Sequence, residues 1–137
     1  MMACRYSNTN SNIETVRLLL NQPNIDINKQ NKDGWTALMM ACRFSNTESN
    51  TKTVELLLNK PNIDVNKYDN CNWTSLMMAC RYNNTDSNID TIKLLLDNPN
   101  IIINKRDKKG MDAFSIACKY NGIGSNFELI KLLMNYY

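Results

Sequence analysis

Short apolar runs with helical spacing, separated by polar stretches, recur along the chain and predict pairs of short helices. Over residues 36–44, apolar side chains fall at helical spacing behind Thr36, whose hydroxyl can cap the first turn. Residues 45–51 are polar, and their side chains compete with helical backbone bonds, so the first helix should stop there. A second apolar run over residues 54–58 must end before Pro61, because the residue before a proline is disfavoured in a helix. The pattern therefore predicts a helix, a loop, a second helix and an extended connector.

This pattern recurs along the whole chain with a period of 38 residues. The step is kept by Cys4, Cys42, Cys80 and Cys118, by Leu20, Leu58, Leu96 and Met134, and by Pro23, Pro61 and Pro99. Residues 35–72 and 73–110 are identical at 22 of 38 positions, far more than shared composition would produce. We interpret residues 1–137 as one repeat domain with units over about residues 1–34, 35–72, 73–110 and 111–137.

The two end units differ from the central ones. Met1 and Met2 align with Met39 and Met40, so the first unit begins partway along its first helix, and we expect a fraying unit cut from a longer array. The fourth unit is the degenerate one, as a terminal cap is expected to be.

Each unit also carries signals for its second helix and for its turns. Capping boxes are expected where Ser precedes an acid by three residues, at Ser11 with Glu14, Ser87 with Asp90 and Ser125 with Glu128, whereas Ser49 meets Lys52. Positive φ angles are expected in the connectors at Gly34, Asn62, Asn72 and Gly110.

The unit resembles the ankyrin repeat. The matching segments are Thr36-Ala37-Leu38-Met39 and Thr74-Ser75-Leu76-Met77 for the TPLH opening, Ala41-Cys42, Ala79-Cys80 and Ala117-Cys118 for the small pair, Val54 to Leu58 and Ile92 to Leu96 for VKLLL, and Ile63-Asp64-Val65-Asn66 for ADVN. The resemblance implies an all-α repeat, an ankyrin-type solenoid of stacked helix-loop-helix units with finger loops. The unit is longer than the usual 33 residues, mostly through its inter-helix loop. The TPLH His is replaced by Met or Ser, so we expect each finger to be held more loosely.

Composition removes most alternatives to a binding protein. The chain has no His, the commonest general base and a frequent metal ligand, so we expect no enzyme, no metal site and no cofactor. Sixteen Lys and Arg against thirteen Asp and Glu leave a net charge of +3, which is too small to indicate nucleic-acid binding, and no apolar run is long enough to span a membrane.

The 23 Asn fit an AT-rich genome, such as that of a giant virus or a protist. With no secretory signal and five cysteines, we expect a cytoplasmic monomer, in the host cell if the genome is viral.

The repeating cysteines could indicate a metal or redox site and the methionine pairs a binding strip, but both are better interpreted as packing residues. Helices of neighbouring units lie about 8–10 Å apart, too far for the cysteines that repeat with the period to form a disulfide or share one Zn²⁺. We expect them to be small hydrophobic residues in the helix seam, and Cys71, outside that series, to be an expendable loop residue. The pairs Met39-Met40 and Met77-Met78 are read as core rather than as an adaptable binding strip.

Two lines of side chains repeat at the end of the first helix. They are Arg5, Arg43, Arg81 and Lys119, each followed by Tyr6, Phe44, Tyr82 or Tyr120. The resemblance places them, with the finger tips, on a concave groove, a basic surface with aromatics suited to an acidic segment of a partner protein. Alternatively the aromatics cover the enlarged loops, and the basic groups complement the helix dipoles.

Finger tips differ between units while the scaffold stays the same. The tips are Lys32-Asp33, Asn70-Cys71 and Lys108-Lys109, followed by Trp35, Trp73 and Met111. Such positions are either fitted to a partner or unconstrained, and we expect Trp35 and Trp73 to be exposed. The candidate partner-binding residues are Lys32, Asp33, Trp35, Arg43, Phe44, Asn70, Cys71, Trp73, Arg81, Tyr82, Lys108, Lys109, Met111 and Lys119.

A protein–protein interaction scaffold is the function predicted from these residues. The alternatives are a structural spacer without a specific ligand, which the sameness of the central units favours, and the substrate-recruiting arm of a larger protein of the ubiquitin-ligase type.

Overall fold

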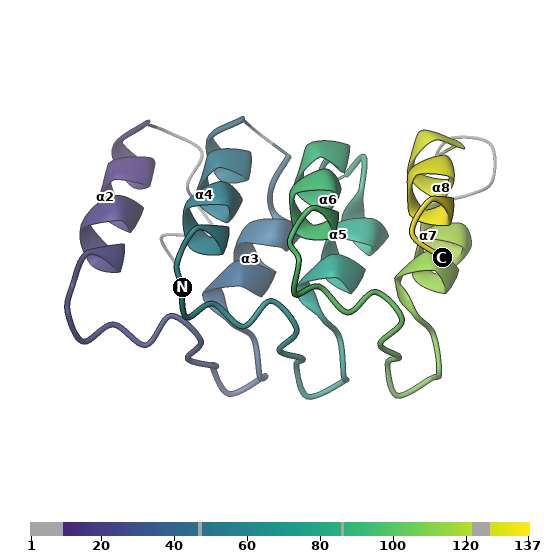
Figure 1. Cartoon of the computed structure of the whole chain (residues 1–137), viewed down its shortest axis with the longest axis horizontal. Coiled ribbons are helices and arrows are strands. Elements are labelled where there is room, and N and C mark those ends of the chain that lie inside the picture. Colours follow the sequence, from purple (N-terminus) through teal and green to yellow (C-terminus); the bar gives the residue numbers. More distant parts are fainter. Residues whose placement is uncertain (1–9, 47, 86, 122–126) are drawn as a thin grey trace.

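The computed structural model describes residues 10–46, 48–85, 87–121 and 127–137, and within them it shows a row of helix pairs (Figure 1). The helices are α2 (Asn10–Leu20), α3 (Ala37–Arg43), α4 (Glu48–Leu58), α5 (Ser75–Tyr82), α6 (Ile89–Leu96), α7 (Ala113–Asn121) and α8 (Phe127–Met134). Helices α2, α4, α6 and α8 form one layer, α3, α5 and α7 form a second, and the connectors extend as fingers along one side of the row, below the helices in Figure 1. The predicted all-α repeat solenoid is confirmed.

The first helix of each central unit starts at the predicted cap. Thr36 Oγ1 accepts the Met39 N–H at 3.2 Å, and Thr74 Oγ1 accepts the Met77 N–H at 3.3 Å. Asp112 does the same for α7, accepting from the Ser115 N–H at 2.9 Å and its hydroxyl at 2.7 Å. Burial opposes ionisation of Asp112, but these hydrogen bonds and the nearby Arg106 outweigh it and lower its pKa. The degenerate unit therefore keeps its helix cap with a different residue.

The capping boxes expected at the second helices are wrong where the structure describes them. Asn88 caps α6, its Oδ1 accepting the Thr91 N–H at 2.9 Å, and Ser87 lies one residue earlier with its hydroxyl 3.0 Å from that of Ser45. Asn is as good a cap as Ser, and the Asn88 amide also donates to Thr51 of the previous unit at 2.9 Å. Ser11 is already the second residue of α2. Ser125 lies outside the described residues.

A hydrophobic core runs the length of the row. Leu57, Leu95 and Leu133 occupy the same position in successive units and are at most 1% exposed. Leu19 holds that position in the first unit and is 43% exposed. Each core layer therefore depends on the units beside it, as is usual in solenoids.

Each finger is fastened by a side chain at its own start. Asp69 Oδ1 accepts the N–H groups of Cys71 and Trp73 at 2.8 and 2.9 Å, and Asp107 accepts those of Lys109 and Met111 at the same two distances. Asn31 holds its finger in the same way. These turns fasten each finger to itself by side-chain hydrogen bonds, although the TPLH His is absent.

Positive φ angles occur at one repeat position of each finger. They are 80° at Gly34, 63° at Asn72 and 76° at Gly110, as predicted, while Asn62 is not among the residues with positive φ. Asn62 instead contributes its carbonyl to a bond with the preceding unit, which needs no left-handed backbone.

Neighbouring connectors are joined by an Asn side chain that bonds the backbone in both directions. The Asn28 amide donates to the Asn62 carbonyl at 2.6 Å and accepts the Asp64 N–H at 2.8 Å. Asn66, 38 residues on, donates to the Asn100 carbonyl at 2.7 Å and accepts the Ile102 N–H at 2.8 Å. We call this two-bond contact the Asn clamp. Asn104, the next in the series, bonds to no residue that the structure describes.

Asn66→Ala is expected to lower the free energy of unfolding by about 1–3 kcal/mol, because it removes two hydrogen bonds that each contribute about 0.5–1.5 kcal/mol net. Asn104→Ala is the matched control and should stay within about 0.5 kcal/mol of the wild type. Urea unfolding followed by circular dichroism measures both. Equal losses in the two variants would show that the clamp does not join the units.

Candidate partner-binding face

Two adjoining cavities are formed by the fingers and first helices of neighbouring units. One, of about 250 Å³, is lined by Trp35, Asp69, Cys71, Trp73, Met78, Arg81, Tyr82 and Tyr120. The other, of about 200 Å³, is lined by Asp33, Trp35, Met40, Arg43 and Phe44. Trp35 borders both, so the two form one surface, which we call the groove face.

Arginine and aromatic side chains stack along this face from one unit to the next. The Arg43 Cζ lies 4.3 Å from the Tyr82 ring centroid, 4.9 Å from that of Phe44 and 5.3 Å from that of Trp35. The Arg81 Cζ lies 3.8 Å from the Tyr120 ring, 5.2 Å from Tyr82 and 5.7 Å from Trp73. These distances permit cation–π attraction, and Tyr82 is shared by both arginines. Phe44 and Tyr82 therefore contact the arginines of the groove face.

Neither guanidinium has a hydrogen-bond acceptor or a carboxylate partner among the described residues. Arg43 Nε and Arg81 Nη1 are buried without an acceptor, and no carboxylate in the described part of the chain lies within 4.0 Å of either group. Arg106 provides the contrast, since it donates to the Gly110 carbonyl at 2.6 Å and lies 3.7 Å from Asp112. Both groove arginines are in the last turn of their helix, where a positive charge is favourable.

The remaining predicted site residues include exposed residues at the finger tips and two half-buried tryptophans beneath the arginines. The tips Lys32, Asp33, Asn70, Cys71, Lys108 and Lys109 are exposed. The Asn70 amide donates to the Lys32 carbonyl at 3.0 Å, so this side chain joins two fingers. Trp35 and Trp73 are half-buried under the arginines, which corrects the expectation that they are exposed.

At the far end of the row, Lys119 and Met111 lie beside each other, away from both cavities. Lys119 Nζ is 4.0 Å from Met111 Sδ, and Met111 packs against the core. Lys119 lies 5.4 Å from the Tyr120 ring, so it continues the stacking more weakly. Arg5 and Tyr6 lie outside the described residues.

Several lining residues were missed as site residues, namely Met40, Asp69, Met78 and Tyr120. Met39, Met77 and Met78 are buried core residues, at most 3% exposed, and Met40 is half-buried, while Met40 and Met78 also border the groove cavities. Tyr120 continues the 38-residue series of Phe44 and Tyr82, and this recurrence was the signal for it.

Buried thiols explain the repeating cysteines. Cys42 and Cys80 are fully buried in the core, and burial raises the pKa of both far above the usual value for a thiol. The four described cysteines form no disulfide with one another, and no group of three metal-ligating side chains occurs among the described residues. Cys4 lies outside the described residues.

Native-state alkylation is therefore expected to modify Cys71, which is exposed, and to leave Cys42 and Cys80 unmodified until the protein is unfolded. Iodoacetamide labelling with mass mapping of the peptides measures this, and labelling in urea is the control. Early modification of Cys42 or Cys80 would contradict the packing of the helix seam.

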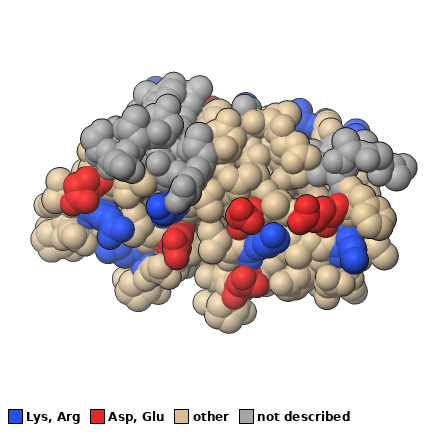
Figure 2. Space-filling model, turned by 90° about the horizontal axis from the view of Figure 1, so that it is seen from above, with Lys and Arg blue, Asp and Glu red and all other residues tan. Residues whose placement is uncertain are grey.

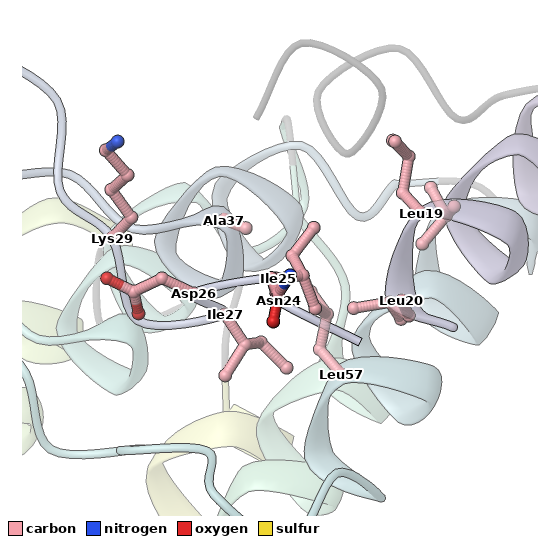
Figure 3. A pocket seen from close by; sticks show the side chains of 10 residues that line it. Leu19, Leu20, Asn24, Ile25, Asp26, Ile27, Lys29, Ala37 and Leu57 are labelled. Carbon is pink, nitrogen blue, oxygen red and sulfur yellow. The ribbon is translucent and has the colours of Figure 1, made fainter. Parts of the chain in front are cut away.

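A larger cavity of about 440 Å³ lies beside α2, away from the groove face. It is lined mainly by apolar side chains from α2, its connector, α3 and α4, and Leu20, Ile25, Ile27 and Leu57 converge on it (Figure 3). Few polar groups face it, so it resembles an open edge of the core rather than a specific site.

On the face opposite the fingers, the charged side chains in view form no extended patch of one sign. Acidic and basic side chains lie interspersed among uncharged ones there (Figure 2). No described helix is both long and apolar enough to cross a membrane.

Stacked helix pairs with fingers and an aromatic groove define a helical repeat protein of the type that presents a preformed surface. A family model described as ankyrin repeats (3 copies) matches residues 1–107 and again residues 45–137. The chain belongs to the ankyrin-repeat family. Its members are in general protein–protein interaction modules and typically adaptors without enzymatic activity. The sequence matches no curated protein.

Proposed function

We propose that this protein binds a partner protein on its groove face, through an acidic segment of the partner. The observation that carries the proposal is the continuous row of half-buried arginines and aromatics lining two cavities that neighbouring units form together. Tryptophan, tyrosine and arginine are the residues most enriched at binding hot spots. Because the fingers are already fastened, binding would cost little ordering entropy.

Cytoplasm is the setting that we propose. Four described cysteines that form no disulfide suit a reducing compartment. The protein is proposed to act there as a monomeric adaptor.

Site-specific photocrosslinking tests the face. A photoreactive amino acid is placed at Met40, which lines the groove, and at Asn59 as a matched control, which lines a cavity between α4 and α6. In a lysate of the cell that makes the protein, the Met40 variant is expected to give a defined adduct and the Asn59 variant none.

Adducts from Asn59 alone would place the interface on the other layer of helices and overturn the proposal. An absence of adducts from both positions would favour the structural spacer.

A further inference from the structure

We propose that Arg43 and Arg81 form a pair of carboxylate receptors, and that they bind two acidic side chains three residues apart in an extended segment of the partner. The inference rests on the proposed function and names the chemistry that the groove face recognises.

The two guanidinium groups lack the acceptors that a half-buried arginine normally has. Each has five N–H donors, and within the described chain neither group donates a hydrogen bond to any atom. A buried donor without an acceptor is costly, and the surrounding rings offset only part of that cost. A ligand that supplies acceptor oxygens can bond the remaining N–H groups of each guanidinium, which are not buried and donate to no described atom.

Carboxylate is the ligand group that fits this environment. Its two oxygens accept two parallel N–H bonds from one guanidinium, and the surrounding rings exclude water and strengthen the attraction. The acidic residues lining the cavities are Asp33 and Asp69, and neither lies within 4.0 Å of the arginines in the described structure. Asp69 already accepts two N–H groups of its own finger.

Spacing between the receptors follows from the ring that they share. Both Cζ atoms lie within 5.2 Å of the Tyr82 ring centroid, so they are at most about 10 Å apart, and they occupy equivalent positions of the packed helices α3 and α5, whose axes are expected to lie about 8–10 Å apart. In a polyproline II segment, residues i and i+3 lie on the same face about 9 Å apart. Two glutamates at i and i+3 of an extended segment therefore match the pair.

The chain carries its own reporters for this binding. Its two tryptophans, Trp35 and Trp73, lie 5.3 and 5.7 Å from Arg43 and Arg81 respectively. Tryptophan emission and the Nε–H resonances of the two arginines should therefore change when a carboxylate binds.

The test titrates the protein with a twelve-residue Gly/Ser peptide that carries two glutamates three residues apart. This peptide is expected to bind at least about tenfold more tightly than the same peptide with one glutamate, and the peptide with two glutamines should not bind. Arg43→Gln and Arg81→Gln should each weaken binding at least about tenfold. Arg17→Gln, on α2, makes the same change in net charge away from the groove and should have no effect.

Two further variants separate recognition from folding. Arg43→Lys with Arg81→Lys keeps the charge but loses the planar fork, so its affinity should fall between those of the wild type and the double Gln variant. Arg43→Glu with Arg81→Glu should bind the corresponding two-lysine peptide instead, with a helical circular dichroism spectrum like that of the wild type.

Equal affinity for the glutamate and glutamine peptides, or an equal loss with Arg17→Gln, would overturn the inference. A partner that crosslinks at Met40 and is retained by the double Gln variant would leave the proposed function intact while removing the carboxylate pair.

Discussion

Leu95→Ala is expected to be among the most destabilising single changes in this protein, lowering the free energy of unfolding by about 2–5 kcal/mol. Leu95 is fully buried on α6, in the cluster that joins units across the row. Truncation leaves a cavity that the surrounding helices can fill only partly. For a domain of this size, such a loss is a large share of the total stability.

Leu19→Ala is the matched control, because the same side chain occupies the same repeat position on α2 but is 43% exposed. It should cost clearly less than Leu95→Ala, and thermal and urea unfolding of both variants would measure the difference. Similar losses would mean that the core does not depend on neighbouring units in the way that the structure indicates.

Gly34→Ala should destabilise the protein by about 2–5 kcal/mol, through two effects that add. The φ of Gly34 is 80°, which costs a residue with a Cβ about 1–2 kcal/mol. The added Cβ would also lie 2.8 Å from the Asn70 backbone nitrogen and 3.0 Å from the Asp69 Cα, and backbone cannot move away cheaply.

Gly110→Ala separates the two effects. Gly110 has a φ of 76°, but a Cβ there meets no atom within 4 Å. It should therefore show the conformational cost alone, about 1–2 kcal/mol. Denaturant unfolding of the two variants side by side measures the steric part as their difference, and a difference near zero would contradict the close packing of adjacent fingers.

Period and helix layout could be predicted from the sequence because both are local or repetitive. Thr36 and Thr74 cap their helices as expected, and the second helices end before the prolines. The cap of α6 was placed one residue too early, because Ser87 and Asn88 are equally good caps and only the hydrogen bonds to the preceding unit distinguish them.

Contacts between units were the part that could not be predicted. The recurrence of Asn28, Asn66 and Asn104 was visible, but its reason lies in backbone groups of the next unit, about 36 residues away in sequence. The stacking of Arg43 on Tyr82 likewise depends on how far one unit is turned and shifted against the next. A repeat pattern indicates that such contacts recur without showing which atoms meet.

The Asn clamp has a consequence for how such an array can change in length. The second unit carries both halves of the joint, since Asn66 reaches forward to the next unit and the backbone of Asn62 and Asp64 receives Asn28 of the unit before it. A genetic event that duplicates or deletes any 38 consecutive residues therefore rebuilds the same joint at the new seam, wherever the breakpoint falls in the unit. Arrays of this kind can be lengthened or shortened in one step, with the groove face growing or shrinking by one arginine position each time.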